Sequence, residues 1–166
     1  PVVTDWRQLL KTDLDGVVVA TPPATHGEIL RECVTVGIPV MIEIDCDGHR
    51  AGVPAADVAQ LVAIGRALHD GGAALRGVVT HAGESYHCVG RAALEAMAEQ
   101  ERARAVACAT VLREAGLPSP MVSVGSTPTA AFTRNAEGVT EIRAGVFPFF
   151  DLFMTGLGVC ARDDVA

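Results

Sequence analysis

Apolar and polar residues follow two patterns that alternate along this chain of 166 residues. Short runs that are almost wholly apolar are typical of buried strands, and segments with apolar residues on one face are typical of helices. The predicted strands cover residues 17–20, 39–44, 75–83 and 121–124, and a last element covers 140–151. The predicted helices cover 5–10, 26–34, 55–70 and 91–115. This alternation predicts an α/β fold with a parallel sheet. Because a closed (β/α) barrel needs eight strands, about five strand units predict only a partial (β/α) barrel.

The run from residue 38 to 53 joins a strand to a polar segment. It begins with a strand from Pro39 to Ile44 that is apolar except for Glu43. Strands of this composition are typical of parallel sheets that are covered on both faces. Polar and turn-forming residues follow directly, namely Asp45, Asp47, Gly48 and Arg50. Since such folds carry their chemistry at the carboxyl ends of the strands, we expect residues 45–50 at the rim of a site.

Composition narrows the class of protein. A hydrophobic content of 49% is enough for one core, and a formal charge of −7 argues against a nucleic-acid partner. No apolar run is long enough to span a membrane and no signal peptide is visible, so we expect no membrane association. The five cysteines lack disulfide or metal spacing, which favours a reduced, cytoplasmic setting. Neither end resembles a natural terminus, so we expect a segment that is incomplete at both ends.

The turn after residue 124 has the composition of a phosphate site. A strand ending in Gly125, Ser126 and Thr127 offers bare backbone N–H groups and two hydroxyls, and both kinds of donor suit a phosphate. An ordinary Ser/Thr turn has the same composition.

Four motifs occur in a family order within about residues 40–160. They are the strand and rim at 42–53, the run Gly77–Tyr86, the turn at 123–129 and the segment 141–147. Together they resemble the D-threonine aldolases and D-serine dehydratases, which are fold-type III pyridoxal 5′-phosphate (PLP) enzymes related to alanine racemase. The resemblance implies a partial barrel of the alanine racemase N-terminal type.

The resemblance also implies roles for named residues. His81 would pack on the face of the pyridine ring, although a rim histidine bonded to a neighbouring carbonyl is the alternative. Tyr86 would contact the cofactor or the substrate, or would only anchor its loop. Arg50 would contact the phenolate oxygen of the ring, unless it forms a surface ion pair with Asp45 or Asp47.

The remaining cofactor contacts would come from the last two motifs. Gly125, Ser126 and Thr127, together with Gly145 and Val146, would hold the phosphate. Arg143 would approach the ring nitrogen and, by like-charge repulsion, disfavour its protonation. Glu141 is the alternative partner and would have the opposite effect.

By resemblance, the function is that of a PLP-dependent lyase acting on a small D-3-hydroxy amino acid, by dehydration of D-serine or aldol cleavage of D-threonine. A divalent metal and a homodimer are also implied. The family's metal ligands fall in a C-terminal β domain and none is assigned here. Of the 13 basic residues only Lys11 is a lysine, and it does not match the lysine to which this family links PLP.

Residues 4–43 resemble a different family, the glucose–fructose oxidoreductase and inositol dehydrogenase nucleotide-binding domain, most closely at 21–26. The G-x-G-x-x-G fingerprint that grips a pyrophosphate is absent, so we expect no appreciable NAD(P) binding. We predict an oxidoreductase-like β-α-β unit over 1–43 and a PLP-barrel-like segment over 40–166, packed together as one domain. The alternatives to the lyase are a non-catalytic phosphate- or PLP-binding module and a remnant NAD-dependent oxidoreductase.

Overall fold

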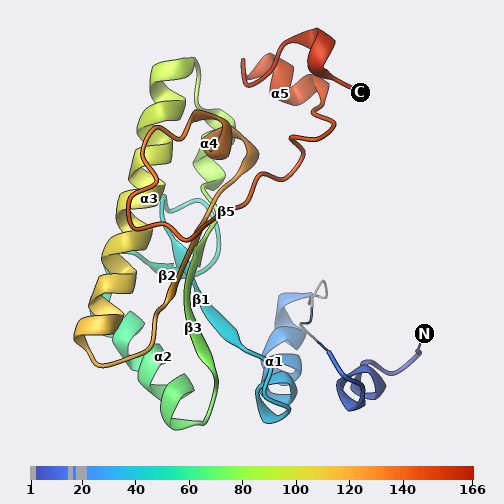
Figure 1. Cartoon of the computed structure of the whole chain (residues 1–166), viewed down its shortest axis with the longest axis vertical. Helices are drawn as coiled ribbons and strands as arrows, with labels where there is room; N and C mark the ends of the chain where they lie inside the picture. Colours follow the sequence, from blue (N-terminus) through green and yellow to red (C-terminus); the bar gives the residue numbers. More distant parts are fainter. Residues whose placement is uncertain (1–2, 15–16, 18–21) are drawn as a thin grey trace.

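A single parallel sheet forms the centre of the computed structural model, which describes residues 3–14, 17 and 22–166 (Figure 1). The strands are β1 (Val40–Asp45), β2 (Val53–Pro54), β3 (Leu75–Thr80), β4 (Met121–Val124) and β5 (Glu141–Ile142). They lie in the order β2-β1-β3-β4-β5, and every pairing is parallel. Within the described residues the sheet therefore stays open, with the two-residue strands β2 and β5 at its edges.

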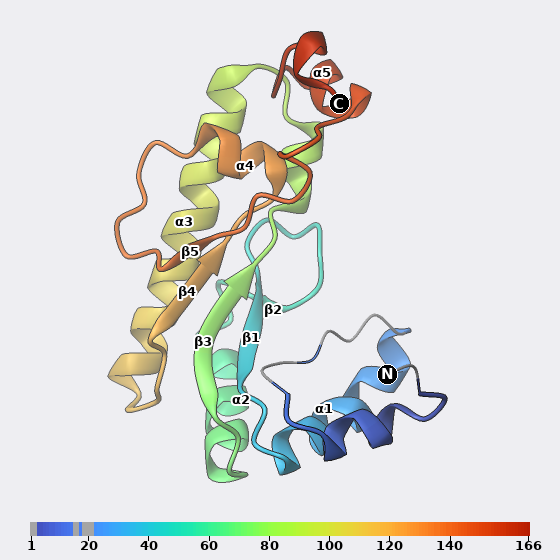
Figure 2. The ribbon, with the colours of Figure 1, turned by 45° about the vertical axis from the view of Figure 1, so that its right-hand side comes forward.

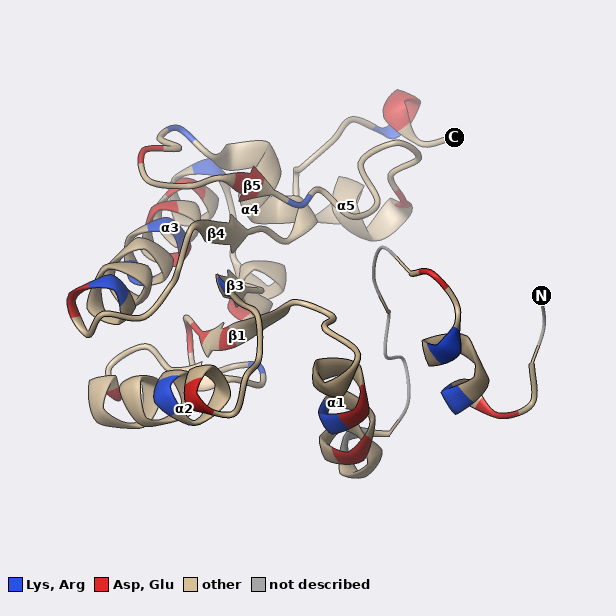
Figure 3. Ribbon diagram, turned by 60° about the horizontal axis from the view of Figure 1, so that its bottom comes forward, with Lys and Arg blue, Asp and Glu red and all other residues tan. Residues whose placement is uncertain are grey.

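The helices connect the strands and extend beyond them. The α-helices are α1 (His26–Thr35), α2 (Val58–Asp70), α3 (Arg91–Glu114), α4 (Thr127–Phe132) and α5 (Leu152–Gly156). Short 3₁₀ helices are η1 (Trp6–Lys11), η2 (Pro23–Thr25), η3 (Gly83–His87) and η4 (Arg162–Asp164). Figure 3 shows α2 and α3 side by side on one face of the sheet. None of the helices in the described part of the chain is long and apolar enough to cross a membrane.

The core lies between the sheet and the helices α2 and α3. Buried strand residues such as Ile44, Val78 and Val122 contact Leu61 of α2 and a stripe of small and apolar residues on α3. The stripe includes Ala105, Cys108, Ala109 and Leu112. Burial in β1 alternates because successive side chains point to opposite faces: Ile42 and Ile44 are buried, whereas Glu43 between them is exposed. The expectation that this strand is covered on both faces is therefore wrong at Glu43.

The structure confirms the α/β class and the parallel sheet, and it shifts several element boundaries. Helix α2 begins at Val58 rather than Ala55, because the Asp57 carboxylate caps it by accepting from the Gln60 N–H at 3.0 Å. Val53 and Pro54, which were not predicted as a strand, pair with the end of β1 instead. The strand predicted over 17–20 falls almost wholly outside the described residues.

The last predicted element, residues 140–151, contains a strand of only two residues. Only Glu141 and Ile142 pair with β4, and residues 143–151 leave the sheet. The Arg143 N–H still donates to the Val124 carbonyl at 2.8 Å, but a turn then forms in which the Phe149 and Phe150 N–H groups donate to the Val146 carbonyl. The turn directs the chain into α5, so the segment after Ile142 crosses the end of the sheet.

Candidate functional site

A cavity of about 350 Å³ lies at the carboxyl ends of β3, β4 and β5. It is lined by most of the residues that sequence analysis selects, although these come from three separate segments of the chain. Those residues are His81, Tyr86, Gly125, Ser126, Thr127, Arg143, Gly145 and Val146, and α5 and its cap add Asp151, Phe153 and Met154. The volume is within the range of about 300–1,000 Å³ found for small-molecule sites.

Arg143 is held rigidly at one wall of this cavity. Its Nη1 donates to the Ser123 hydroxyl at 3.0 Å, and its Nη2 donates to the Gly125 carbonyl at 3.1 Å and to the Thr80 carbonyl. The guanidinium therefore bridges the ends of β3 and β4, and its side chain is half-buried. None of these partners carries a charge, so the positive charge remains available to a ligand.

Glu141, the alternative to Arg143, is exposed and does not line the cavity. Its carboxylate accepts a hydrogen bond from the Ser123 hydroxyl. Ser123 thus accepts from Arg143 and donates to Glu141. The geometry favours Arg143 over Glu141 as the residue that faces a ligand.

The turn after β4 requires glycine at its first position. Gly125 has φ +132°, and a Cβ there would lie 2.4 Å from the Arg143 carbonyl oxygen. Gly145 faces the same turn, where a Cβ would lie 3.2 Å from the Thr127 hydroxyl oxygen. Bare backbone at both glycines lets the two segments approach closely beside the cavity.

The two hydroxyls of this turn are already engaged within the protein. Ser126 is the N-cap of α4: its side chain accepts from the Thr129 N–H at 3.3 Å and lies 2.8 Å from the Ser85 hydroxyl. The Thr127 hydroxyl accepts from the Val146 N–H at 3.0 Å. Both residues are nearly fully buried. These hydroxyls therefore have partners within the protein, and their role toward a phosphate stays a prediction.

His81 and Tyr86 form a stack of rings along the cavity. Their ring centroids are 5.8 Å apart with an interplanar angle of 18°, and Phe153 continues the stack at 6.2 Å from Tyr86. Burial, and then the charges of Arg50 and Arg143, lower the pKa of His81, which favours a neutral imidazole. Burial also raises the pKa of Tyr86, so its phenol stays protonated near neutral pH.

Arg50 lies beside the cavity rather than in its lining. The stem of its side chain covers Gly83, where a Cβ would lie 2.6 Å from the Arg50 Cγ. Asp45 and Asp47 bind backbone N–H groups instead, and no ion pair joins either of them to Arg50 in the described chain. The surface ion pair considered for Arg50 is therefore not formed.

Glu101 of α3 is a buried residue that sequence analysis missed. Its Oε1 accepts from the Thr80 hydroxyl, the Ala82 N–H and the Gly125 N–H, at 2.9, 3.2 and 3.0 Å. Its Oε2 accepts from the Thr129 hydroxyl at 2.6 Å. With only 1% of its surface exposed, the carboxylate joins the end of β3 to the turn that leads into α4.

This fold and site define the class of protein. Residues 4–152 match the family described as the alanine racemase N-terminal domain, and the chain belongs to that family of fold-type III PLP proteins. The D-threo-3-hydroxyaspartate dehydratase of Delftia sp. (strain HT23) is 55% identical over 157 residues, a match covering 95% of this chain and 40% of the relative. The D-serine dehydratase of Dictyostelium discoideum is 28% identical over 135 residues, which are 76% of this chain and 34% of the relative. The chain thus spans less than half the length of these two relatives.

Solved structures agree with this assignment. The structure of the Delftia dehydratase superposes with a TM-score of 0.80 and 47% identity, over 90% of this chain and 46% of that one. The D-threonine aldolase of Filomicrobium marinum shares the fold, with a TM-score of 0.67 over 84% of this chain and 38% of that one.

Proposed function

We propose that this chain forms the PLP-binding part of a lyase that acts on D-3-hydroxy amino acids. The observation that carries the proposal is the convergence of His81, Arg143 and the turns at 125–127 and 145–146 on one cavity. These residues come from three strand ends, so their meeting depends on the fold. The two dehydratase relatives support the choice of substrate class.

The residues present fit a planar, phosphorylated pyridine. The cavity lining combines aromatic rings, one fixed cation and the two glycines Gly125 and Gly145. The N–H groups of Gly125, Ser126 and Val146 already donate within the protein. The donors we assign to the phosphate are therefore the Thr127 and Gly145 N–H groups and the Ser126 and Thr127 hydroxyls, whose residues line the cavity. The Thr127 N–H now interacts with the Tyr86 phenol and lowers its pKa against the effect of burial, so this donor already faces a polar group in the cavity.

Arg143 would set the electronic character of the bound ring. Held by the Ser123 hydroxyl and two carbonyls, its guanidinium would face the ring nitrogen and disfavour a proton there. When bound, PLP supplies the electron sink that stabilises negative charge at the substrate Cα. An unprotonated ring nitrogen makes PLP a weaker electron sink. By disfavouring the proton, Arg143 would therefore limit the reactions that the bound cofactor can support.

His81 and Tyr86 would position the ring rather than carry its charge. The neutral imidazole of His81 stacks without adding a second cation beside Arg143. Tyr86, protonated near neutral pH, can donate a hydrogen bond to the cofactor or the substrate. The divalent metal that the family resemblance implies would act at the substrate hydroxyl through ligands that we do not assign in this chain.

The test is calorimetric titration of this chain with PLP, pyridoxal and inorganic phosphate. A Lys11→Ala background removes covalent attachment to the only lysine. We expect saturable PLP binding that weakens at least tenfold in Arg143→Met. Arg134→Met is the matched control, because Arg134 is an exposed partner of Glu95 outside the cavity lining. A stable conjugate, phosphopyridoxyl-D-serine, should bind more tightly than its L enantiomer.

Three outcomes would contradict the proposal. Equal binding of phosphate and PLP would favour a non-catalytic phosphate module. Equal binding of the two conjugates would remove the D-amino acid specificity. Saturable NADH binding would favour the oxidoreductase alternative.

A further inference from the structure

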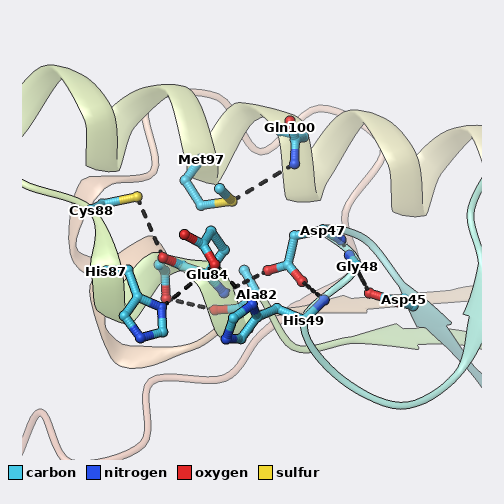
Figure 4. A network of polar contacts seen from close by, with 11 residues as sticks. Asp45, Asp47, Gly48, His49, Ala82, Glu84, His87, Cys88, Met97 and Gln100 are labelled. Atoms are coloured by element: carbon cyan, nitrogen blue, oxygen red, sulfur yellow. Dashed lines mark hydrogen bonds and ion pairs between the residues drawn. The ribbon is translucent and has the colours of Figure 1, made fainter.

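His49, Glu84 and His87 bring three potential metal ligands together outside the cavity lining (Figure 4). His49 comes from the loop between β1 and β2, and the other two come from η3. The His49 Nδ1 lies 2.9 Å from the Glu84 Oε2, and the His87 Nδ1 lies 3.5 Å from the same oxygen. The three ligand atoms all lie within 4.8 Å of one another.

This separation is close to what one cation requires. Two ligand atoms bound to a tetrahedral ion at about 2.1 Å lie about 3.4 Å apart. Small side-chain rotations are enough to reach that spacing, because 49%, 42% and 60% of the side-chain surfaces of His49, Glu84 and His87 are exposed. The imidazole rings, with centroids 4.9 Å apart and an interplanar angle of 63°, can both turn a nitrogen to a shared ion.

The backbone that carries these ligands is held by a separate residue. The Asp47 Oδ1 accepts from the His49 N–H at 3.0 Å, and its Oδ2 accepts from the Glu84 N–H at 2.8 Å. One carboxylate therefore fixes the distance between the two loops, as Figure 4 shows. The side chains above it are partly exposed and can turn toward an ion, while their attachment points stay in register.

We propose that His49, Glu84 and His87 form a binding site for a transition-metal dication such as Zn²⁺. Two imidazoles and one carboxylate are a donor set that holds Zn²⁺ in metalloproteases. Imidazole donors suit Zn²⁺, Ni²⁺ and Cu²⁺, whereas Mg²⁺ and Ca²⁺ require oxygen ligands. The site uses residues of this chain alone and is separate from the metal ligands that the family resemblance places in a C-terminal domain.

The ion would stabilise the wall of the neighbouring cavity. Arg50 follows His49 in sequence, and Tyr86 lies between Glu84 and His87. A metal that joins the two segments would therefore restrict the positions of Arg50 and Tyr86. This inference does not depend on which ligand the cavity binds.

The test is calorimetric titration of the metal-free chain with Zn²⁺, under a reductant that does not chelate metals. We expect one ion per chain, and each of His49→Asn, Glu84→Gln and His87→Asn should weaken binding at least tenfold. His69→Asn is the matched control, since His69 is an exposed histidine of α2. Cys88→Ser is the second control, because the Cys88 thiol lies 3.6 Å from the Glu84 carbonyl and is a competing ligand beside the site.

Circular dichroism establishes that each variant is folded. Binding that is unchanged in the three ligand variants, or that is lost only in Cys88→Ser, overturns the proposal. Absence of saturable Zn²⁺ binding by the folded wild-type chain overturns it as well. Zn²⁺ should also protect residues 47–52 and 83–88 from hydrogen exchange, and exchange that is unchanged by Zn²⁺ would contradict the proposed link between the two loops.

Discussion

The Glu101 carboxylate connects the two strand ends that form the cavity. It accepts hydrogen bonds from two hydroxyls and two backbone N–H groups, which belong to residues 80, 82, 125 and 129. No basic residue pairs with Glu101 among the described salt bridges. Its charge is stabilised by these dipoles, so removal of the carboxylate leaves buried donors without acceptors.

We predict that Glu101→Leu lowers the free energy of unfolding by roughly 3 kcal/mol or more, because buried donors lose their acceptor. Glu101→Gln should cost less, about 1–3 kcal/mol, since one amide oxygen can still accept while the NH₂ group opposes the donors. Urea unfolding measures both values. Glu99→Gln on the same helix is the control and should change stability by less than about 1 kcal/mol, because the Glu99 side chain is 51% exposed and solvent screens its pair with Arg102. An equal loss of unfolding free energy in Glu99→Gln and Glu101→Gln would show that the Glu101 carboxylate does not stabilise the fold through its buried donors.

The family resemblance selects His81, Tyr86 and Arg143, because they fall in its motifs at 77–86 and 141–147. It does not include Glu101, which lies inside a long helix. In sequence, a glutamate that lies among many arginines and glutamates indicates a helix face exposed to solvent, so Glu101 does not stand out. The signal lies in its spacing, because Leu94, Ala98, Glu101, Ala105 and Cys108 recur at three- and four-residue intervals and are all buried. A charged residue on that stripe must find buried donors, and only the tertiary fold reveals which ones.

His81 should make the stability of the chain depend on pH. Its pKa in the folded chain is below the ordinary value of 6.5, mainly because of burial. The unfolded chain therefore binds more protons between the two pKa values, so stability rises with pH in that window and is lost as the pH falls below 6.5. We predict that His81→Asn loses less stability than wild type between pH 7 and pH 5, as measured by urea unfolding. His69→Asn should keep the wild-type dependence, and an identical pH profile for His81→Asn would refute the prediction.

At the scale of elements, the turn from β4 into α4 combines two local requirements. Ser126 caps the helix and bonds to Thr129 in a capping box, while Gly125 takes a positive φ and lies against the Arg143 backbone. The first requirement can be predicted from sequence, because serine is a preferred N-cap residue. The second depends on the neighbouring segment, since nothing local shows how closely Arg143 approaches.

Gly125→Ala should destabilise the chain by about 2 kcal/mol or more, because alanine is strained at this φ and its Cβ meets the Arg143 carbonyl. It should also abolish PLP binding. Gly27→Ala is the control: this helical glycine of α1 has nothing within 4 Å of an added Cβ, so alanine should stabilise by about 0.5–1 kcal/mol. Thermal unfolding measures both variants. If alanine is tolerated equally at 125 and 27, the close approach of the two segments is not required.

The long elements could be predicted from sequence, and the short ones could not. Helix α3 begins at Arg91 as expected, because 24 residues give a clear helical period. The strands β2 and β5 have two residues each, too few to show alternation. They form only because their neighbours in the sheet supply hydrogen-bond partners, and that information is not local.

At the scale of the molecule, the open sheet and its C-terminal segment expose apolar surface. Phe147, Phe149, Leu152 and Phe153 are 56%, 68%, 68% and 56% exposed, and the nearby edge strand β5 has unpaired backbone groups on one side. Apolar clusters and open edges both recruit other chains. We therefore predict self-association, consistent with the homodimer that the resemblance implies.

Sedimentation velocity over a range of concentrations tests this prediction. The double variant Phe149→Ser, Leu152→Ser should shift the distribution of sedimentation coefficients toward that of the monomer. Val36→Ser is the control, because Val36 is 48% exposed but follows α1, at the end of the molecule opposite α5. A monomer at every concentration, or an equal effect of Val36→Ser, would show that the apolar segment does not mediate association.

The position of the only lysine limits what this chain can catalyse alone. Lys11 ends η1 and is exposed, and η1 packs on α1. Figures 1 and 2 both show these two helices at the end of the molecule opposite α4 and α5. A lysine that takes part in PLP chemistry must reach the cofactor in its pocket, so we predict no lyase activity for this chain on D-serine or D-threonine.

Borohydride reduction after incubation with PLP, followed by peptide mapping, should find less than one label per chain at Lys11. Non-covalent PLP binding should be the same in Lys11→Ala as in wild type, because the cavity does not include residue 11. Stoichiometric labelling of Lys11, with turnover that disappears in Lys11→Ala, would instead show that η1 moves to the cavity and completes the site.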